Sequence, residues 1–370
     1  MPDREVVELL SRLVEIDSVN PDLIAGGAGE SEIARFVAEW LERAGLDVDM
    51  WDTRAGRPNV VGIARGRGGG RSLLLNAHTD TVGVAGMDDA HVARVDGDRM
   101  YGRGAYDMKG GLSAIMLAGA AAANAGLAGD VLVTAVVDEE VASIGAEALV
   151  DRYDADAAIV TEPTELEVAV AHKGFVGFEI ETAGVAAHGS RPHLGVDAIR
   201  KMGPVLQRLD ALDRQLQGGE PHPLVGPPSL HASLIEGGQE YSSYPARCLL
   251  TAERRTIPGE DREQVERDLR NLAGDDGEFR RTLSREPFEV GAAEEIVRLV
   301  SDRAGKQPSG VSFWADSGIL AGAGIPTVLY GPLGDGAHAV VEWVDLPSVE
   351  RVRDVLVSVA EAFCSDRPRL

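Results

Sequence analysis

Acidic or histidine side chains follow apolar, strand-like runs or glycine-rich turns at five places along this chain. The residues are His78, Asp107, the pair Glu139–Glu140, Glu162 and His338. Three of the five places come directly after an apolar run, and in an open α/β sheet ligands bind outside the carboxyl ends of the strands. The repeated placement predicts that these side chains meet at one edge of a sheet.

This set of side chains has the chemistry of a metal site. Zinc in proteins takes histidine nitrogen and carboxylate oxygen as ligands, and two-metal sites hold a pair of such ions close together. A single histidine, or an Asp-Glu-Glu run by itself, is more often a solvated surface feature. The same placement repeated five times favours a functional cluster over a structural network of charges.

The charge of the chain argues against two classes of partner. Its 60 acidic residues outnumber its 36 basic ones, and the formal net charge is −24. Nucleic acid and anionic membranes require a basic surface, so neither is an expected partner. The most apolar stretch, residues 112–125, is shorter than the roughly 20 residues that a membrane span needs.

The N-terminal segment and the cysteines indicate a cytoplasmic protein. Residues 3–14 have the pattern of an amphipathic helix with charges throughout, which does not fit a secretory signal. The two cysteines, Cys248 and Cys364, offer no disulfide framework and have no metal-ligand spacing. We therefore expect the reducing environment of the cytoplasm.

The pattern of the first half of the chain predicts an α/β domain. Apolar strand-like runs alternate with helical patterns, which is typical of a mostly parallel sheet covered on both faces. Helices are predicted at about 3–15, 29–44, 111–125 and 143–152, and strands at 46–51, 58–65, 73–77, 131–137 and 157–160.

The pattern changes after residue 172. Strands and helices are then predicted in the order βαββαβ, which is that of a ferredoxin-like domain, and α/β character resumes near residue 288. The predicted strands lie at 175–182, 229–235, 246–256 and 278–284, with helices at 196–215 and 260–273. Because 370 residues exceed one ordinary core, we expect two domains. Residues 1–172 and 287–370 would form the catalytic domain, and residues 173–286 an inserted lid and dimerisation domain.

Three motifs resemble those of the dizinc aminoacylase and carboxypeptidase-type metallohydrolases. They are His78-Thr-Asp80, Gly102-Arg-Gly-Ala-Tyr-Asp-Met-Lys-Gly-Gly111 and Gly331-Pro-Leu-Gly-Asp-Gly-Ala-His338. That family includes acetylornithine deacetylase, succinyl-diaminopimelate desuccinylase, aminoacylases and glutamate carboxypeptidase. The resemblance covers essentially the whole chain and implies two bound divalent ions, zinc first, with cobalt or manganese as alternatives.

The resemblance also implies roles for the residues of these motifs. Asp107 would bridge the two ions, His78 and Glu162 would complete one ligand set, and Glu140 and His338 the other. Asp80 would accept a hydrogen bond from the far nitrogen of His78. Glu139 would be the general base, because a carboxylate bound to a dication cannot accept a proton.

Other roles implied by the resemblance concern the substrate. His188 would hold the developing oxyanion, from the partner subunit of a homodimer formed through the inserted domain. Arg255 would bind a substrate carboxylate with its planar fork, while Arg254 is expected on the opposite, solvated face of the same strand. The glycine-rich loop, with Gly331 and Gly334, could present N–H groups to that carboxylate.

The sequence departs from the family pattern at two substrate-binding positions. Ser242 stands where relatives carry Asn, and Glu253 stands where relatives carry Asp two residues before the arginine. The other histidines are interpreted as structural; they are His91, His172, His193, His222 and His231.

These observations favour a dizinc hydrolase of linear amides, namely an N-acyl-amino-acid amidohydrolase similar to acetylornithine deacetylase. A dipeptidase or carboxypeptidase with the same metals is the alternative, so the expected partner is a small acylated amino acid or dipeptide. A catalytically inactive binding protein is disfavoured, because Glu139 is present with every ligand. The fold by itself does not decide among these functions.

Overall fold

The computed structural model describes residues 2–365 and separates into two compact units. The first unit comprises Met1–Val170, Val290–Gly310 and Ala315–Leu370. The second comprises Ala171–Glu289 and Val311–Trp314, so it is inserted in the sequence of the first. The assignment of catalysis to the first unit, and of lid and dimerisation to the second, stays a prediction.

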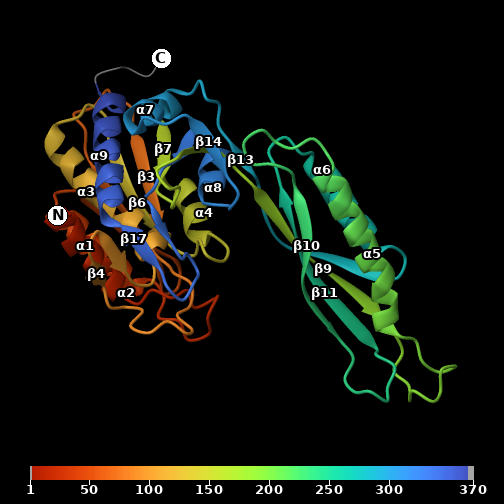
Figure 1. Ribbon diagram of the computed structural model, residues 1–370. Coiled ribbons are helices and arrows are strands. Elements are labelled where there is room, and N and C mark those ends of the chain that lie inside the picture. Colours follow the sequence, from red (N-terminus) through yellow and green to blue (C-terminus); the bar gives the residue numbers. More distant parts are fainter. Residues whose placement is uncertain (1, 366–370) are drawn as a thin grey trace. The chain divides into compact units, whose positions relative to one another are not determined.

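A mixed nine-stranded sheet contains most strands of the first unit (Figure 1). Its order is β1 (Asp47–Arg54), β2 (Arg57–Ala64), β6 (Val131–Val136), β3 (Leu73–His78), β7 (Ala157–Val160), β15 (Thr327–Leu329), β8 (Val168–His172) and β13 (Phe288–Glu289), with β14 (Pro308–Val311) paired to β8. The central strands β6, β3, β7 and β15 are parallel, and β1, β2, β8 and β13 pair antiparallel. The predicted α/β class is confirmed, with a parallel centre and antiparallel flanks.

The central strands are buried on both faces. Every residue of β2, β3, β6 and β7 is buried, as expected for near-continuous apolar strands between layers of helices. The helices of this unit are α1 (Arg4–Glu15), α2 (Ser31–Arg43), α3 (Gly110–Ala125), α4 (Ile144–Val150), α7 (Glu295–Ala304), α8 (Ser317–Gly322) and α9 (Leu346–Phe363). Helix α3 contacts α1, α2 and α9, and α4 contacts α8 (Figure 1).

A small sheet joins two loops that are distant in sequence. Its order is β16 (Gly334–Asp335), β17 (Trp343–Asp345), β5 (Arg99–Tyr101) and β4 (Arg94–Asp96). Trp343 pairs with Tyr101 and Val344 with Met100 in antiparallel register. This pairing brings the segment after His338 beside the segment that leads to Asp107.

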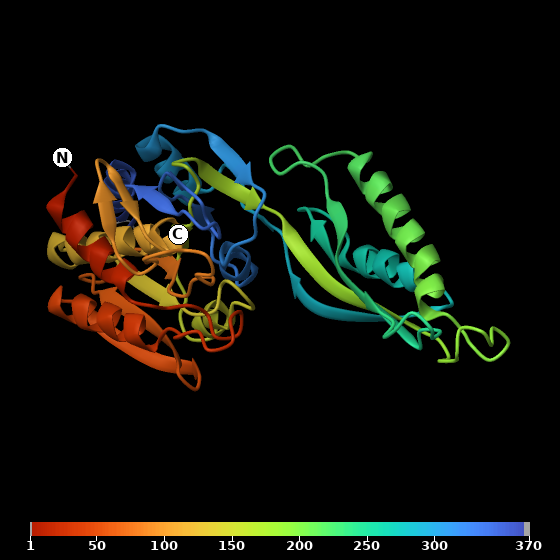
Figure 2. The ribbon, with the colours of Figure 1, turned by 60° about the horizontal axis from the view of Figure 1, so that its bottom comes forward.

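The second unit has the predicted βαββαβ order. Its elements are β9 (Gly174–Ala183), α5 (Ala198–Gln217), β10 (Ser229–Gly237), β11 (Arg247–Thr256), α6 (Arg262–Ala273) and β12 (Gly277–Arg285). The four strands form an antiparallel sheet in the order β10-β11-β9-β12, and α5 and α6 contact each other on one face of it (Figure 2). Residues of β9 and β11 alternate between buried and half-exposed, which fits a sheet with one covered face. The ferredoxin-like prediction is confirmed.

Within residues 2–365, no helix combines the length and the apolar character that crossing a membrane requires.

Close packing of α3 on the central strands gives a test of this arrangement. A Cβ added at Gly119 would lie 2.3 Å from Val133 Cγ2. We expect Gly119→Ala to lower the free energy of unfolding by about 1–3 kcal/mol, because buried helix and strand must move apart. Chemical denaturation followed by circular dichroism measures this.

Gly322, at the end of α8 in the same unit, is the control. A Cβ there meets nothing within 4 Å, so Gly322→Ala should leave stability unchanged or raise it, because alanine is the better helix former. Equal stability of Gly119→Ala and the wild type would contradict the packing.

Candidate metal centre

The carboxyl ends of the parallel strands bring the predicted ligands together. His78 is the last residue of β3, while Glu140 and Glu162 follow β6 and β7. In the first group of ligands, His78 Nε2 lies 3.2 Å from Asp107 Oδ1 and 3.8 Å from Glu162 Oε1. The ligand atoms of these three residues all lie within 4.8 Å of one another, which is suitable for one metal ion.

A second group of ligands shares Asp107 with the first. His338 Nε2 lies 3.4 Å from Asp107 Oδ2 and 3.1 Å from Glu140 Oε2. Asp107 therefore presents one oxygen to each group, which is the geometry of a carboxylate between two cations. Within residues 2–365, these two groups are the candidate metal clusters, and both lie in the first unit.

The charges and contacts of these residues fit divalent cations. Glu162 Oε1 is buried and has no hydrogen-bond partner among the described residues, a costly state for a carboxylate oxygen unless something positive meets it. Burial raises the pKa of Glu162 well above its ordinary range, and the charges of Asp107 and Glu140 add to the effect. Burial also raises the pKa of Glu140. Cations would relieve this repulsion among carboxylates.

Asp80 holds the segment that carries Glu139 and Glu140. Its Oδ1 accepts a hydrogen bond from Glu139 N and its Oδ2 accepts one from Glu140 N, both at 3.2 Å. His78 Nδ1 lies 2.9 Å from the Asp80 backbone oxygen and 3.5 Å from Asp80 Oδ1. The backbone oxygen of Asp80 is thus the nearer acceptor for the imidazole of His78. The Asp80 carboxylate orients the turn that carries Glu139 and Glu140.

Sequence reasoning missed a buried polar network behind Asp80. Asn20 Nδ2 donates to Asp80 Oδ2 at 2.8 Å and to Asp138 Oδ1 at 3.0 Å. Arg57 Nη2 donates to Asp138 Oδ1 at 3.0 Å, and Arg57 also pairs with buried Glu30. No local pattern marks these residues, because only the tertiary fold brings them together.

Glu139 belongs to neither group of ligands, although it is adjacent to Glu140. Removal of its carboxyl from water raises the pKa of Glu139 well above its ordinary range, and the charge of Glu162 is the next largest cause. A carboxyl group beside a metal cluster, with a raised pKa and outside the ligand set, has the properties of a proton acceptor.

The glycine-rich loop after β15 is closely packed. Gly331 N donates to Thr164 Oγ1 at 3.0 Å, so this N–H is used within the protein. A Cβ at Gly331 would lie 1.9 Å from the backbone oxygen of Glu162, and one at Gly334 would lie 2.4 Å from the ring of Tyr106. The two glycines allow the loop to approach the ligand segments.

The predicted substrate residues outside this loop belong to the second unit. His188 is exposed, and its Nδ1 lies 2.8 Å from Ser190 Oγ. Ser242 is exposed and donates to Glu240 at 3.3 Å. Arg255 donates from Nε to Glu253 at 2.6 Å and lies over the Phe175 ring. Their roles toward a substrate stay predictions.

The prediction that Arg254 is solvated is wrong. Arg254 is 2 % exposed, and its guanidinium pairs with Glu260 at 2.5 Å and Asp268 at 3.6 Å. It does lie on the face of β11 opposite to Arg255, but α6 and the preceding loop cover that face and supply the acidic partners.

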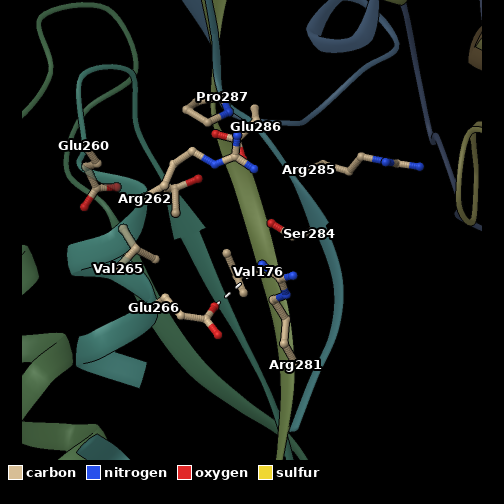
Figure 3. Close-up of a pocket in the computed structure, with 11 residues that line it drawn as sticks. Val176, Glu260, Arg262, Val265, Glu266, Arg281, Ser284, Arg285, Glu286 and Pro287 are labelled. Atoms are coloured by element: carbon tan, nitrogen blue, oxygen red, sulfur yellow. Dashed lines mark ion pairs between the residues drawn. The ribbon is translucent and has the colours of Figure 1, made fainter. Parts of the chain in front are cut away.

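A hollow in the second unit contains ion pairs (Figure 3). Arg262 pairs with Glu286 at 2.9 Å, and Arg281 with Glu266 at 3.7 Å. These contacts pair arginines with glutamates across the hollow, and the residues that line it include no histidine or cysteine. The candidate chemistry therefore lies at the metal centre of the first unit.

Known proteins are similar to this chain over most of its length. The model of Peptidase family M20/M25/M40 matches residues 74–362. A deformylase of N-formyl-4-amino-5-aminomethyl-2-methylpyrimidine from Halalkalibacterium halodurans is 27 % identical over 97 % of this chain and 94 % of its own length. The acetylornithine deacetylase of Proteus mirabilis is also 27 % identical, over 97 % of this chain and 96 % of its own.

A solved structure shares the fold. It is a dinuclear metal-binding peptidase of the M20 family from Bacillus subtilis, with a TM-score of 0.72, 16 % sequence identity and 97 % coverage of each chain.

Metal uptake should release protons. Hydrogen bonds to Asp107 and Glu140 raise the pKa of His338 to about 10 in the metal-free protein, so the ring is protonated near neutral pH. A metal ion binds the neutral imidazole, so zinc affinity should rise with pH up to that pKa, by about tenfold per pH unit for each proton displaced. An indicator dye in weak buffer measures the release. His338→Gln is the control and should release fewer protons, whereas pH-independent affinity would contradict the expectation.

Proposed function

We propose that this chain, which belongs to Peptidase family M20/M25/M40, is a metal-dependent amidohydrolase that cleaves the amide bond of an N-acylated amino acid. The observation that carries the proposal is the pair of ligand groups sharing Asp107, with Glu139 beside them and outside both. The full-length similarity to a deacetylase and a deformylase supports cleavage of an acyl group from an amine.

Two divalent ions, zinc in the first instance, would be held by the two ligand groups. His78, Glu162 and Asp107 would hold one, and Glu140, His338 and Asp107 the other. When bound, such ions supply Lewis acidity to a carbonyl oxygen and lower the pKa of water. The protein would hold the ligand Glu140 and the base Glu139 in position, because Asp80 accepts hydrogen bonds from both of their backbone N–H groups.

Glu139 would take the proton from the attacking water and deliver it to the leaving amine. The ligand carboxylates cannot do this while they bind cations, so the adjacent unligated carboxylate is the available base. Its raised pKa makes it the stronger base, which favours the first half of the cycle, in which it accepts the proton.

Arg255 would hold the α-carboxylate of the substrate. Its Nε pairs with Glu253, and its guanidinium lies over the Phe175 ring. The side chain is 34 % exposed, so its two Nη groups can form the bidentate pair that a carboxylate prefers.

The second unit would also form a homodimer. Strand β10 lies at the edge of its sheet and exposes Leu234 and Ile235. Exposed Ile199 lies beside the end of this strand, since a Cβ at Gly237 would be 3.0 Å from Ile199 Cγ1. An exposed apolar edge strand is typical of a surface that binds another chain. A second copy offers the same edge, and would bring His188 to the oxyanion of the neighbouring site.

A dipeptidase of the same family is the second candidate, because the metal centre serves any amide. The family description and the dinuclear peptidase of the same fold favour it. A screen of metal-reconstituted protein against N-acetyl amino acids, N-formyl amines and dipeptides separates the candidates. Turnover restricted to dipeptides would overturn the deacylase proposal.

Replacement of Glu139 by Gln should separate catalysis from metal binding. Glu139→Gln should retain two metal equivalents and lose about 10²–10⁴-fold in kcat, the range of a missing general base. The control is Glu140→Gln, one residue away, which should lose metal. Metal analysis and turnover are measured on both. Near-wild-type turnover by Glu139→Gln would remove that residue from the mechanism.

The carboxylate proposal predicts discrimination between an acid and its amide. Wild type should hydrolyse an N-acetyl amino acid faster than its C-terminal amide, and Arg255→Ala should lose this preference. Arg255→Lys should retain little of this preference, because lysine lacks the bidentate fork of arginine. Arg247→Ala is the matched control, since Arg247 lies on the same strand and pairs with Glu181 in the same way. Equal turnover of acid and amide by wild type would exclude a carboxylate requirement.

A further inference from the structure

Glu342 is a buried carboxylate with an unusual set of donors. It follows His338 by four residues, is 1 % exposed and lies in the first unit. Its Oε1 accepts hydrogen bonds from the backbone N–H groups of Tyr106, at 2.9 Å, and Asp107, at 3.0 Å. Its Oε2 accepts from Arg103 Nη1, at 2.6 Å, and from Gly104 N, at 3.0 Å.

The donors come from a segment without regular helical geometry. Gly104 has a φ of 77°, and Asp107 has φ −115° and ψ 96°, so the N–H groups between them do not all form helical hydrogen bonds. Successive N–H groups in such a conformation form a concavity that binds an anion. Here the anion is the side chain of Glu342, and one of the bound groups is the backbone of Asp107 itself.

The same contacts reach the turn that carries His338. Arg103 donates from Nη1 to Glu342 and from Nη2 to the backbone oxygen of Ala339, at 2.8 Å, directly after His338. The backbone oxygen of Glu342 accepts from Gly102 N at 3.2 Å. Arg103 and Glu342 therefore connect residues 102–107 with residues 339–342. These contacts lie next to the pairing of β17 with β5.

We infer that Glu342 is a positioning residue of the metal centre, which sets the shared ligand Asp107 and the ligand His338 at their mutual distance through one buried carboxylate. It belongs to neither ligand group and would act through the backbone of Asp107 and of the segment after His338. The inference rests on the proposed function, in which Asp107 lies between two cations.

Glutamine is the informative replacement, because it has nearly the shape of glutamate. One of its two terminal groups is an N–H₂ donor, so it cannot accept from both pairs of donors that now surround Glu342. Either the Tyr106–Asp107 pair or the Arg103–Gly104 pair would lose its acceptor in a buried place. The backbone of Asp107 should then shift or loosen.

The experiment compares metal binding by wild type and Glu342→Gln. Affinity is measured by competition with a chromophoric chelator, and geometry by the visible absorption spectrum of the cobalt-substituted protein. We expect a loss of about 10–100-fold in metal affinity, as for other residues that orient ligands, and a changed cobalt spectrum. Glu295→Gln is the control, because Glu295 forms a two-bond pair with Arg71 away from the ligand segments. It should retain the affinity and spectrum of the wild type.

The outcomes separate positioning from simple stabilisation. A folded Glu342→Gln protein with wild-type affinity and spectrum, and only a lower unfolding temperature, would overturn the inference. If this variant does not fold, Glu342→Asp decides by the same two readouts, since it keeps the charge but withdraws the carboxylate by one methylene. Failure of the wild type to bind two cobalt ions would instead overturn the proposed function on which the inference rests.

Discussion

Asp107, Glu139, Glu140 and Glu162 bring four carboxylates to one edge of the sheet, where burial and mutual repulsion oppose their charged forms. Two histidines offset part of this charge, since hydrogen bonds from His338 and His78 outweigh burial and lower the pKa of Asp107. The pKa values of the three glutamates nevertheless stay raised. Bound cations would offset this repulsion and allow all four carboxylates to be charged near neutral pH.

Polar groups on both sides of the cluster hold it in place. On one side, Asp80 accepts from the Glu139–Glu140 turn and is itself bonded to Asn20, which connects to Asp138 and Arg57. On the other side, Glu342 binds the segment of Asp107. Ligands on loops need such support, because small displacements change metal affinity and orientation of the reacting groups. The ends of the parallel strands place the predicted ligands near one another, and buried polar bonds hold the segments that carry them.

Much of this arrangement follows from local sequence pattern. His78 ends one apolar strand, and Glu140 and Glu162 follow two others; in the structure these strands are parallel neighbours that end at the same edge. The strand predicted at 175–182 is present as β9, whose residues alternate between buried and half-exposed. These features depend on periodicity and on strand ends, which are local properties.

The remaining features depend on contacts between distant segments. Asn20 and Arg57 are 60 or more residues from the acids that they bind in the ligand region, and no period or spacing connects them. The burial of Arg254 has a different cause, because its acidic partners Glu260 and Asp268 are near in sequence and only the packing of α6 on the sheet covers this face. Alternation predicted which face of β11 carries this arginine, but not that a helix covers that face. The antiparallel pairing of the outer strands of the large sheet could not be predicted either, because composition does not reveal which strands are neighbours.

Anomalous diffraction from crystals of the zinc-loaded protein, collected on both sides of the zinc absorption edge, tests the central claim most directly. The account predicts two peaks about 3.5–4 Å apart, the usual spacing of a two-metal site. Asp107 should lie between them, with His78 and Glu162 at one peak and His338 and Glu140 at the other. A single peak, or two peaks without Asp107 between them, would contradict the account.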